Sequence, residues 1–243
     1  MTDDFEAHNR RVIAGMGADA ELTEASRAWF RAASRHEYSY HFTWMGRPII
    51  QFPQDIVAMQ EIIWRVRPDL IIETGIARGG SLVFYASMLQ LLGNGGRVLG
   101  VDVDIRPHNR EAIEAHPMHP HIDMLQGSST DPEIVAQVRR AAEGAGTVLV
   151  LLDSNHTHAH VLRELELYAP LVTRGSYLVV FDTVVEVMPD DFVQDRPWRR
   201  GDNPMTAVRQ FLAGTTRFEV DREIEDKLQL TVAPGGYLRC VED

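Results

Sequence analysis

The sequence is poor in cysteine and in positive charge. Its only cysteine, Cys240, excludes an internal disulfide and leaves no set of thiolates for a metal site. The 24 lysine and arginine residues are outnumbered by 35 aspartate and glutamate residues, which gives a net charge of −11. Such a chain lacks the positive field that attracts phosphate backbones or anionic lipids, so we expect neither a nucleic-acid nor a membrane partner.

Long apolar runs are also missing. No run approaches the ~20 residues needed to span a bilayer, and residues 1–6 are acidic where a signal peptide would be basic. We therefore expect a cytoplasmic protein. The 243 residues are 44% hydrophobic, which is enough to bury a full core, so we expect a single compact domain.

From about residue 70, short apolar runs alternate with longer helical patterns. This alternation predicts an α/β fold of Rossmann-like type, with a mostly parallel sheet and helices on both faces. The predicted central strands are 70–74, 98–102, 121–125, 147–153 and 176–182. The predicted helices between them are 81–92, 109–115, 132–142 and 158–169.

Further segments flank this alternation. Two predicted helices, 22–34 and 53–66, make residues 1–68 a helical extension that covers the substrate, ahead of the main domain at 69–243. The polar segment 188–204 has two interpretations, a lid and a solvated loop. The remaining predicted elements are a helix at 206–213 and strands at 217–220 and 228–232, which bring the sheet to seven strands.

A glycine-rich loop joins the first central strand to the next helix. Its glycines fall where a backbone can approach a ligand without obstruction by a Cβ atom. The spacing differs from the Gly-x-Gly-x-x-Gly fingerprint, which ranks dinucleotides lower and favours another nucleoside cofactor. An ordinary tight turn is the alternative. The residues predicted to bind the cofactor on this loop are Glu73, Thr74, Gly75, Arg78, Gly79, Gly80 and Ser81.

One strand later, Asp102 ends an apolar run. A carboxylate at that point can accept hydrogen bonds from ribose hydroxyls, and a helix cap is the alternative. Because Asp102 and the glycine-rich loop follow neighbouring strands, each supports the other as part of a nucleoside site.

Two more carboxylates close central strands. Asp153 follows the fourth strand and Asp182 the fifth, so both are expected at the same sheet edge as the glycine-rich loop. With Thr183, Asn155 and water, they suit an octahedral Mg²⁺ that would lower the pKa of a substrate hydroxyl. His156 would then accept the proton of that hydroxyl, and Asp153 would share the catalytic role. The alternative is that Asp153 caps the next helix and the histidines are solvated.

Aromatic residues gather ahead of the main domain and in the polar segment. The residues that could line a substrate pocket are Tyr38, Tyr40, Trp44, Arg47 and Trp198. Such a stretch also packs as a hydrophobic cover or a subunit contact, and on that basis we expect a homo-oligomer.

Several motifs, taken together, resemble those of a known family. They are Trp44-Met45-Gly46-Arg47-Pro48, Glu73-Thr74-Gly75-Ile76-Ala77-Arg78-Gly79-Gly80-Ser81, Leu152-Asp153-Ser154-Asn155-His156, Gly175-Ser176-Tyr177, Phe181-Asp182-Thr183 and Asp195-Arg196-Pro197-Trp198. From about residue 40 to residue 241, the chain resembles the cephalosporin hydroxylase and rhamnosyl O-methyltransferase family.

The resemblance implies a methyltransferase fold and activity. It implies S-adenosylmethionine (SAM) on the glycine-rich loop and Asp102, with Ser128 and Asp153 as further contacts, and a divalent metal near Asp153 and Asp182. The expected reaction is methylation of a hydroxyl on a small molecule, such as a sugar or a glycosylated natural product. Some relatives carry Glu-Asp where this chain has Asp182-Thr183, so a third metal ligand would be the Thr183 hydroxyl or Glu186.

The sequence is also compatible with two other functions. An iron-dependent hydroxylase or other oxidoreductase would need two histidines and one carboxylate, which His156, His158 and Asp153 could supply. A non-catalytic subunit that binds SAM without transferring its methyl group is the second.

Overall fold

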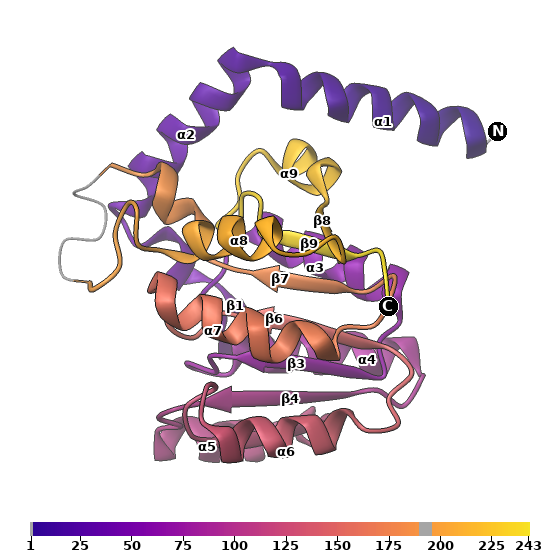
Figure 1. The fold of residues 1–243 in the computed structure, drawn as a ribbon, viewed down its shortest axis with the longest axis vertical. Coiled ribbons are helices and arrows are strands. Elements are labelled where there is room, and N and C mark those ends of the chain that lie inside the picture. The colour runs from indigo at the N-terminus through magenta and orange to yellow at the C-terminus, as the bar shows by residue number, and fades with distance from the viewer. Residues whose placement is uncertain (1, 190–195) are drawn as a thin grey trace.

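The computed structural model describes residues 2–189 and 196–243 and centres on one sheet (Figure 1). Its strand order is β5-β4-β3-β6-β7-β9-β8. The strands are β3 (Leu70–Thr74), β4 (Arg97–Asp102), β5 (Ile122–Gln126), β6 (Val148–Leu152), β7 (Tyr177–Val180), β8 (Phe218–Val220) and β9 (Tyr237–Cys240). The first five in the spatial order run parallel, and β9 lies antiparallel between β7 and β8. The predicted α/β sheet is confirmed.

The structure has nine α-helices within its described residues, and most of them cover the two faces of the sheet. They are α1 (Thr2–Ala18), α2 (Ala20–Ser34), α3 (Pro53–Val66), α4 (Gly80–Leu92), α5 (Pro107–Glu114), α6 (Pro132–Ala142), α7 (His158–Tyr168), α8 (Pro204–Ala213) and α9 (Arg222–Leu228). A short hairpin of β1 (Thr43–Trp44) and β2 (Arg47–Pro48) precedes α3. Among the described residues, no helix combines the length and the apolar character needed to cross a bilayer.

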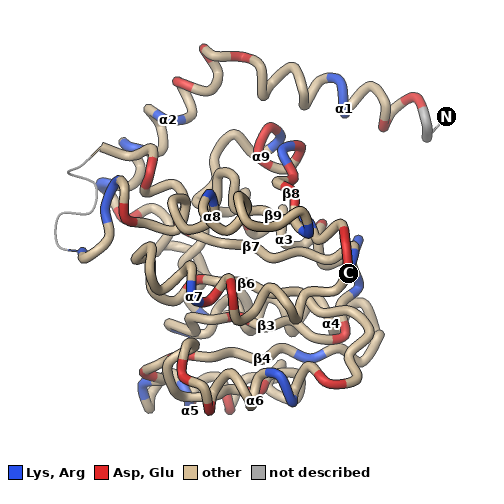
Figure 2. The backbone as a smooth tube through the Cα atoms, viewed as in Figure 1, with Lys and Arg blue, Asp and Glu red and all other residues tan. Residues whose placement is uncertain are grey.

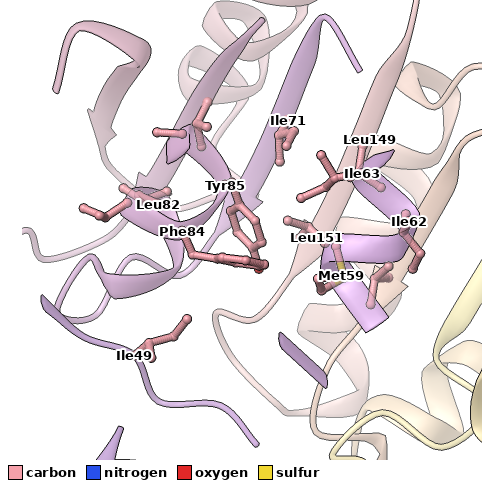
Figure 3. Close-up of a cluster of buried hydrophobic side chains, with 14 of the residues drawn as sticks. Ile49, Met59, Ile62, Ile63, Ile71, Leu82, Phe84, Tyr85, Leu149 and Leu151 are labelled. Atoms are coloured by element: carbon pink, nitrogen blue, oxygen red, sulfur yellow. The ribbon is translucent and has the colours of Figure 1, made fainter. Parts of the chain in front are cut away.

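Alternate side chains of the buried strands point to opposite faces of the sheet and pack against different helices. In β3, Ile71 packs with the side chains of α3 and α4, whereas Leu70 and Ile72 pack with α6, α7 and α8. Figure 3 shows the first of these clusters, where Ile71 and Leu149 from the sheet meet side chains of α3 and α4. The central strands β6 and β7 carry no charged residue, and β3 carries one, Glu73; the other charged positions lie mostly on helices and loops, with both signs interspersed (Figure 2). Burial on both faces explains the continuous apolar runs of the sequence.

The register of the strands brings the residues at the carboxyl ends of β3, β4 and β6 close together. Thr74 is paired with Val101 on one side and Leu152 on the other, so the chain leaves β3, β4 and β6 at the same level. The residues that follow, Gly75, Asp102 and Asp153, therefore meet at the carboxyl edge of the sheet.

The C-terminal part differs from the prediction. Residues 228–232 were expected to form a strand, but Leu228 ends α9, residues 229–232 follow it outside the sheet, and the last strand is Tyr237–Cys240. The apolar run is explained by packing outside the sheet, where Leu230 and Val232 pack against a buried cluster that includes Phe52. The Thr231 hydroxyl and the Val232 amide also bind the buried carboxylate of Asp55. Helices α1 and α9 were not predicted. Helix α1 lies at the far end of the molecule, beyond α9, which it contacts (Figure 1).

Candidate active site

Two cavities open at the carboxyl edge of the sheet. The first, which we term the cofactor cavity, has a volume of about 410 Å³. Its lining residues come from the end of β4, the loops after β3, β4, β5 and β6, and the start of α7: Gly75, Ala77, Val101, Asp102, Val103, Ser128, Ser129, Asp153, Ser154, Asn155 and His160. Four of the predicted cofactor contacts therefore line the same cavity: Gly75, Asp102, Ser128 and Asp153.

The second cavity, termed the acceptor cavity, has a volume of about 500 Å³. Residues of the N-terminal segment, among them Phe30, Tyr38, Tyr40 and Phe52, form one wall, and residues after β6 and β7 form another. The two cavities share Ala77, Asp153 and Ser154. A donor in one cavity and an acceptor in the other would meet at these residues.

The glycines of the loop are required by the protein's own packing. Gly75 has φ +95°, and a Cβ added to it would lie 2.0 Å from the Asp153 carbonyl oxygen. A Cβ on Gly80 would lie 2.1 Å from the carbonyl oxygen of Pro48 in β2. From the sequence, these glycines were expected to allow the approach of a ligand; in the structure they allow the close approach of the residue after β6 and of β2.

Asp102 organises the loop as well as lining the cofactor cavity. Its Oδ2 accepts hydrogen bonds from the amides of Ile76 at 2.8 Å and Ala77 at 3.2 Å, and its Oδ1 accepts one from Asp104 at 2.9 Å. A carboxylate has about four acceptor positions, so it retains capacity for a ligand hydroxyl. The alternative of a helix cap is not what the structure shows.

Glu73 and Thr74 lie below the loop rather than in the cofactor cavity. Both are fully buried, and Glu73 accepts a hydrogen bond of 2.7 Å from the Ser81 hydroxyl. Burial raises the pKa of Glu73 to about 8, so this carboxyl is protonated at neutral pH. Arg78 and Ser81 line a smaller pocket next to Asp153. These residues support the loop, and the cavity wall itself is formed by others.

A cluster of potential metal ligands lies where the two cavities meet. One oxygen each of Asp153 and Asp182 and a ring nitrogen of His156 lie within 4.8 Å of one another. His156 Nε2 is 3.1 Å from Asp182 Oδ2. Loss of hydration, followed by repulsion from Asp182, raises the pKa of Asp153 well above its usual value. A cation at this point would relieve that repulsion.

The other proposed ligands have different partners. The Thr183 hydroxyl donates to the Pro234 carbonyl at 2.7 Å and is fully buried. Glu186 accepts hydrogen bonds from the Gly201 amide at 2.9 Å and from Asn203 at 2.6 Å. Asn155 accepts from Thr157. The structure thus brings His156, not these residues, to the two aspartates.

His158 does not complete a site with two histidines and one carboxylate. Its Nδ1 lies 2.8 Å from the Thr206 hydroxyl, and its Nε2 lies 3.0 Å from Gln210 Oε1, so both ring nitrogens have partners on α8. The iron-dependent alternative is therefore not favoured.

A polar network in the cofactor cavity was not foreseen. His160 Nε2 lies 3.1 Å from the Ser129 hydroxyl and 3.2 Å from the Ser154 hydroxyl. Ser154 also donates to the fully buried Glu164 at 2.8 Å. The four-residue spacing of His160 and Glu164 on α7 was a usable signal, because it puts both on one face of the helix.

The predicted substrate residues divide into two groups. Tyr38, Tyr40 and Trp198 line the acceptor cavity. Trp44 and Arg47 are not among the described residues that line it. The Trp44 indole donates to the Ser87 hydroxyl at 3.0 Å and packs on Phe84 of α4, with ring centroids 4.7 Å apart. Trp44 therefore packs between the β1–β2 hairpin and α4, where its ring has an apolar neighbour and its N–H has a hydrogen-bond acceptor.

Trp198 stands at the metal-ligand cluster. Its ring meets that of His156 edge to face at 4.7 Å, and the Arg196 guanidinium lies 5.3 Å from the Trp198 ring centre. The predicted lid at 188–204 falls partly on 190–195, outside the described residues. Its described end is anchored, because Asp202 accepts the His158 amide at 2.8 Å.

The sheet with its antiparallel β9, and the paired cavities at its carboxyl edge, define the fold of SAM-dependent methyltransferases. A solved structure of CmcI with Mg and SAM covers 84% of this chain and 78% of its own, with a TM-score of 0.60 at 20% identity. An O-methyltransferase from Bacillus cereus in complex with SAH covers 83% of this chain and 82% of its own, with a TM-score of 0.54 at 16% identity.

Sequence comparison gives the family. Residues 36–241 match the Rhamnosyl O-methyltransferase/CmcI family. A rhamnosyl O-methyltransferase of Mycobacterium leprae is 34% identical over 206 residues, which are 81% of this chain and 82% of the relative. One of Mycobacterium bovis is 32% identical over 202 residues, 81% of this chain and 77% of the relative. The chain belongs to this family and is an O-methyltransferase of the SAM-dependent class, as the motifs indicated.

Proposed function

We propose that this enzyme transfers the methyl group of SAM to a hydroxyl of a sugar or glycosylated small molecule, assisted by Mg²⁺. The observation that carries the proposal is the meeting of the two cavities at Asp153, beside His156 and Asp182. Relatives named for rhamnosyl O-methylation support a sugar hydroxyl as the acceptor.

The residues of the cofactor cavity fit SAM. Asp102 offers carboxylate acceptors to the ribose hydroxyls, and Ser128 and Ser129 line the same cavity after β5. Ala77 and Asp153 bound the cavity on the side of the acceptor. SAM supplies an electrophilic methyl group, and the protein contributes mainly by holding donor and acceptor in line.

The two aspartates fit a hard divalent cation. Mg²⁺ is commonly held by one or two carboxylates together with water and substrate oxygens. Asp153 and Asp182 provide that number, and their mutual repulsion favours occupation by a cation. When bound, the ion lowers the pKa of a coordinated hydroxyl and orients neighbouring oxygens of the acceptor.

His156 is the proposed general base. With two carboxylates holding the ion, its imidazole is left to accept the hydroxyl proton. The Nε2 atom of the ring lies 3.1 Å from Asp182 Oδ2. The protonated ring is then stabilised by that carboxylate. Trp198 packs edge-on to the ring at 4.7 Å and limits the access of water.

The acceptor wall suits a molecule with both apolar and hydroxylated parts. Aromatic side chains of Phe30, Tyr38, Tyr40, Phe52 and Trp198 face the same cavity as the carboxylates. Aromatic faces next to acidic acceptors are a usual arrangement for sugar rings. Residues 1–68 would thus act as the substrate cover.

The experiment is a methyl-transfer assay with purified enzyme, SAM and a panel of rhamnosides and other glycosides. Release of SAH should match formation of a methylated sugar, and a chelator should suppress both until Mg²⁺ is restored. Tight SAM binding without any product across the panel would instead identify a non-catalytic binding subunit. Turnover unaffected by the chelator would remove Mg²⁺ from the mechanism.

A further inference from the structure

The hairpin of β1 and β2 packs against the cofactor loop. The side chain of Arg47 in β2 is hydrogen-bonded to the loop backbone. Its Nε donates to the Arg78 carbonyl at 3.1 Å, and its Nη2 donates to the same oxygen. Next to it, Pro48 presses on Gly80, where any Cβ would collide with its carbonyl. The Trp44–Pro48 motif therefore has a role at the loop.

Asn109 of α5 completes the contact from the other side. Its side chain is 5% exposed, and its Nδ2 donates to the Ala77 carbonyl at 3.0 Å. Its Oδ1 accepts a hydrogen bond from Arg47 Nη2 at 3.3 Å. Two consecutive loop carbonyls, those of Ala77 and Arg78, are thus held by one bonded pair of side chains.

The residue that they hold is strained. Ala77 has φ +46°, a left-handed conformation that residues with a Cβ adopt only when their surroundings enforce it. Its amide donates to Asp102 at 3.2 Å, so its backbone is fixed on both sides. Ala77 also lines both the cofactor cavity and the acceptor cavity.

We propose that Arg47 and Asn109 are positioning residues for methyl transfer, which hold Ala77 as the partition between the two cavities. The inference rests on the proposed function. Neither residue is among the described residues that line either cavity, so both act through the loop. Because β2 continues into Ile50 and Gln51 of the acceptor wall, the pair also ties that wall to the cofactor loop.

Three variants separate this role from direct contact with the acceptor. Arg47→Met removes the donors to Arg78 and to Asn109. Asn109→Asp replaces the donor to Ala77 with a carboxylate oxygen and keeps an acceptor for Arg47. The double variant tests whether the two act as one unit. Arg139→Met is the matched control, because Arg139 is an exposed arginine on α6.

Calorimetry with SAM and steady-state kinetics are the readouts. Each single variant should weaken SAM binding about tenfold, the size expected for one lost hydrogen bond to a constrained backbone. The loss of SAM affinity in the double variant should be smaller than the product of the two single losses, because the two side chains are hydrogen-bonded to each other and act together. The KM of the acceptor should change little, and Arg139→Met should match the wild type.

Hydrogen exchange of the cofactor-free enzymes gives a readout independent of SAM. Amides of residues 76–80 should exchange faster in Arg47→Met and Asn109→Asp, while those of β6 keep their protection. Unchanged SAM affinity together with unchanged exchange would overturn the inference. An effect confined to the KM of the acceptor would overturn it too and would make Arg47 a substrate contact. Failure of the wild type to bind SAM would instead refute the proposed function.

Discussion

At the scale of single residues, the site gathers several carboxyl groups, three of which are costly to ionise: Asp153, Glu73 and Asp55. Asp153, Asp182 and the buried Glu73 and Asp55 influence one another, and burial is the largest cause of the raised pKa in Asp153, Glu73 and Asp55. Two of them, Asp153 and Asp182, reach the cavity where a cation can compensate them. Glu73 and Asp55 instead accept hydrogen bonds from neutral hydroxyl groups, those of Ser81 and Thr231.

Asp153→Asn should separate cofactor binding from catalysis. The amide keeps the size of the side chain but removes the negative charge that a divalent cation needs. We expect turnover to fall at least about 100-fold, on the order of 3 kcal/mol of barrier, with SAM affinity changed little. Asp123→Asn, at an exposed ion pair with Arg97, is the control. Mg²⁺-stimulated turnover at the wild-type rate in Asp153→Asn would contradict the assignment.

Glu73→Gln should change the pH dependence of stability. Folding raises the pKa of Glu73 to about 8, so at lower pH the folded state holds a proton that the unfolded chain releases. Stability should therefore fall as pH rises toward 8, by on the order of 3 kcal/mol between about pH 5 and about pH 8. Glutamine cannot ionise, so the variant should show a flatter profile in urea denaturation. Glu61→Gln should retain the wild-type slope.

Trp198→Ala should act on the acceptor side. Its ring lines the acceptor cavity and covers His156, so its loss should raise the KM of the acceptor about tenfold, the scale of an aromatic contact. SAM binding should be unchanged. Trp64→Ala, at an exposed tryptophan of α3, should leave both constants alone. A selective loss of SAM affinity would contradict the division into two cavities.

At the scale of elements, the loop after β3 is the most constrained segment. Gly75→Ala would combine an unfavourable positive φ with a Cβ 2.0 Å from the Asp153 carbonyl. We expect it to destabilise the protein by about 3 kcal/mol or more, measured as the free energy of unfolding. Gly15→Ala in α1, where a Cβ meets nothing within 4 Å, should stay within about 1 kcal/mol of the wild type.

Periodicity predicted the elements that are buried on both faces or strongly amphipathic. The limits of β3 and of α3 were predicted as observed, since apolar runs and flanking turn residues mark them. The short strand β9 was missed because it is a four-residue segment whose pairing with β7 and β8 is non-local.

Strand ends located Asp102, Asp153 and Asp182, because parallel strands deliver their carboxyl ends to one edge. Hydrogen-bond partners that lie far apart in the sequence could not be predicted in this way. Thr183 binds the carbonyl of Pro234, 51 residues further on, and Arg47 binds the loop 31 residues away. Pairings of this kind depend on how elements dock, and local sequence patterns carry little information about docking.

At the scale of the whole molecule, we expect the chain to self-associate. Large apolar side chains are exposed on α1, α2 and α3, among them Phe5, Val12, Trp29 and Trp64. Analytical ultracentrifugation should give a mass of a dimer or larger, and the double substitution Phe5→Ser with Val12→Ser should reduce it. Leu91→Ser, at an exposed leucine of α4, is the control. A monomer at all accessible concentrations would contradict this expectation.

On the whole-molecule scale, the proposed function depends on SAM binding in the cavity between the ends of β3, β4 and β6. Calorimetric titration of the purified enzyme with SAM, and separately with NAD, tests it most directly. We predict saturable binding of one SAM per chain and no heat of binding with NAD, in line with the loop's departure from the dinucleotide spacing. Absence of SAM binding both with Mg²⁺ and with chelator, or binding of NAD instead, would contradict the account.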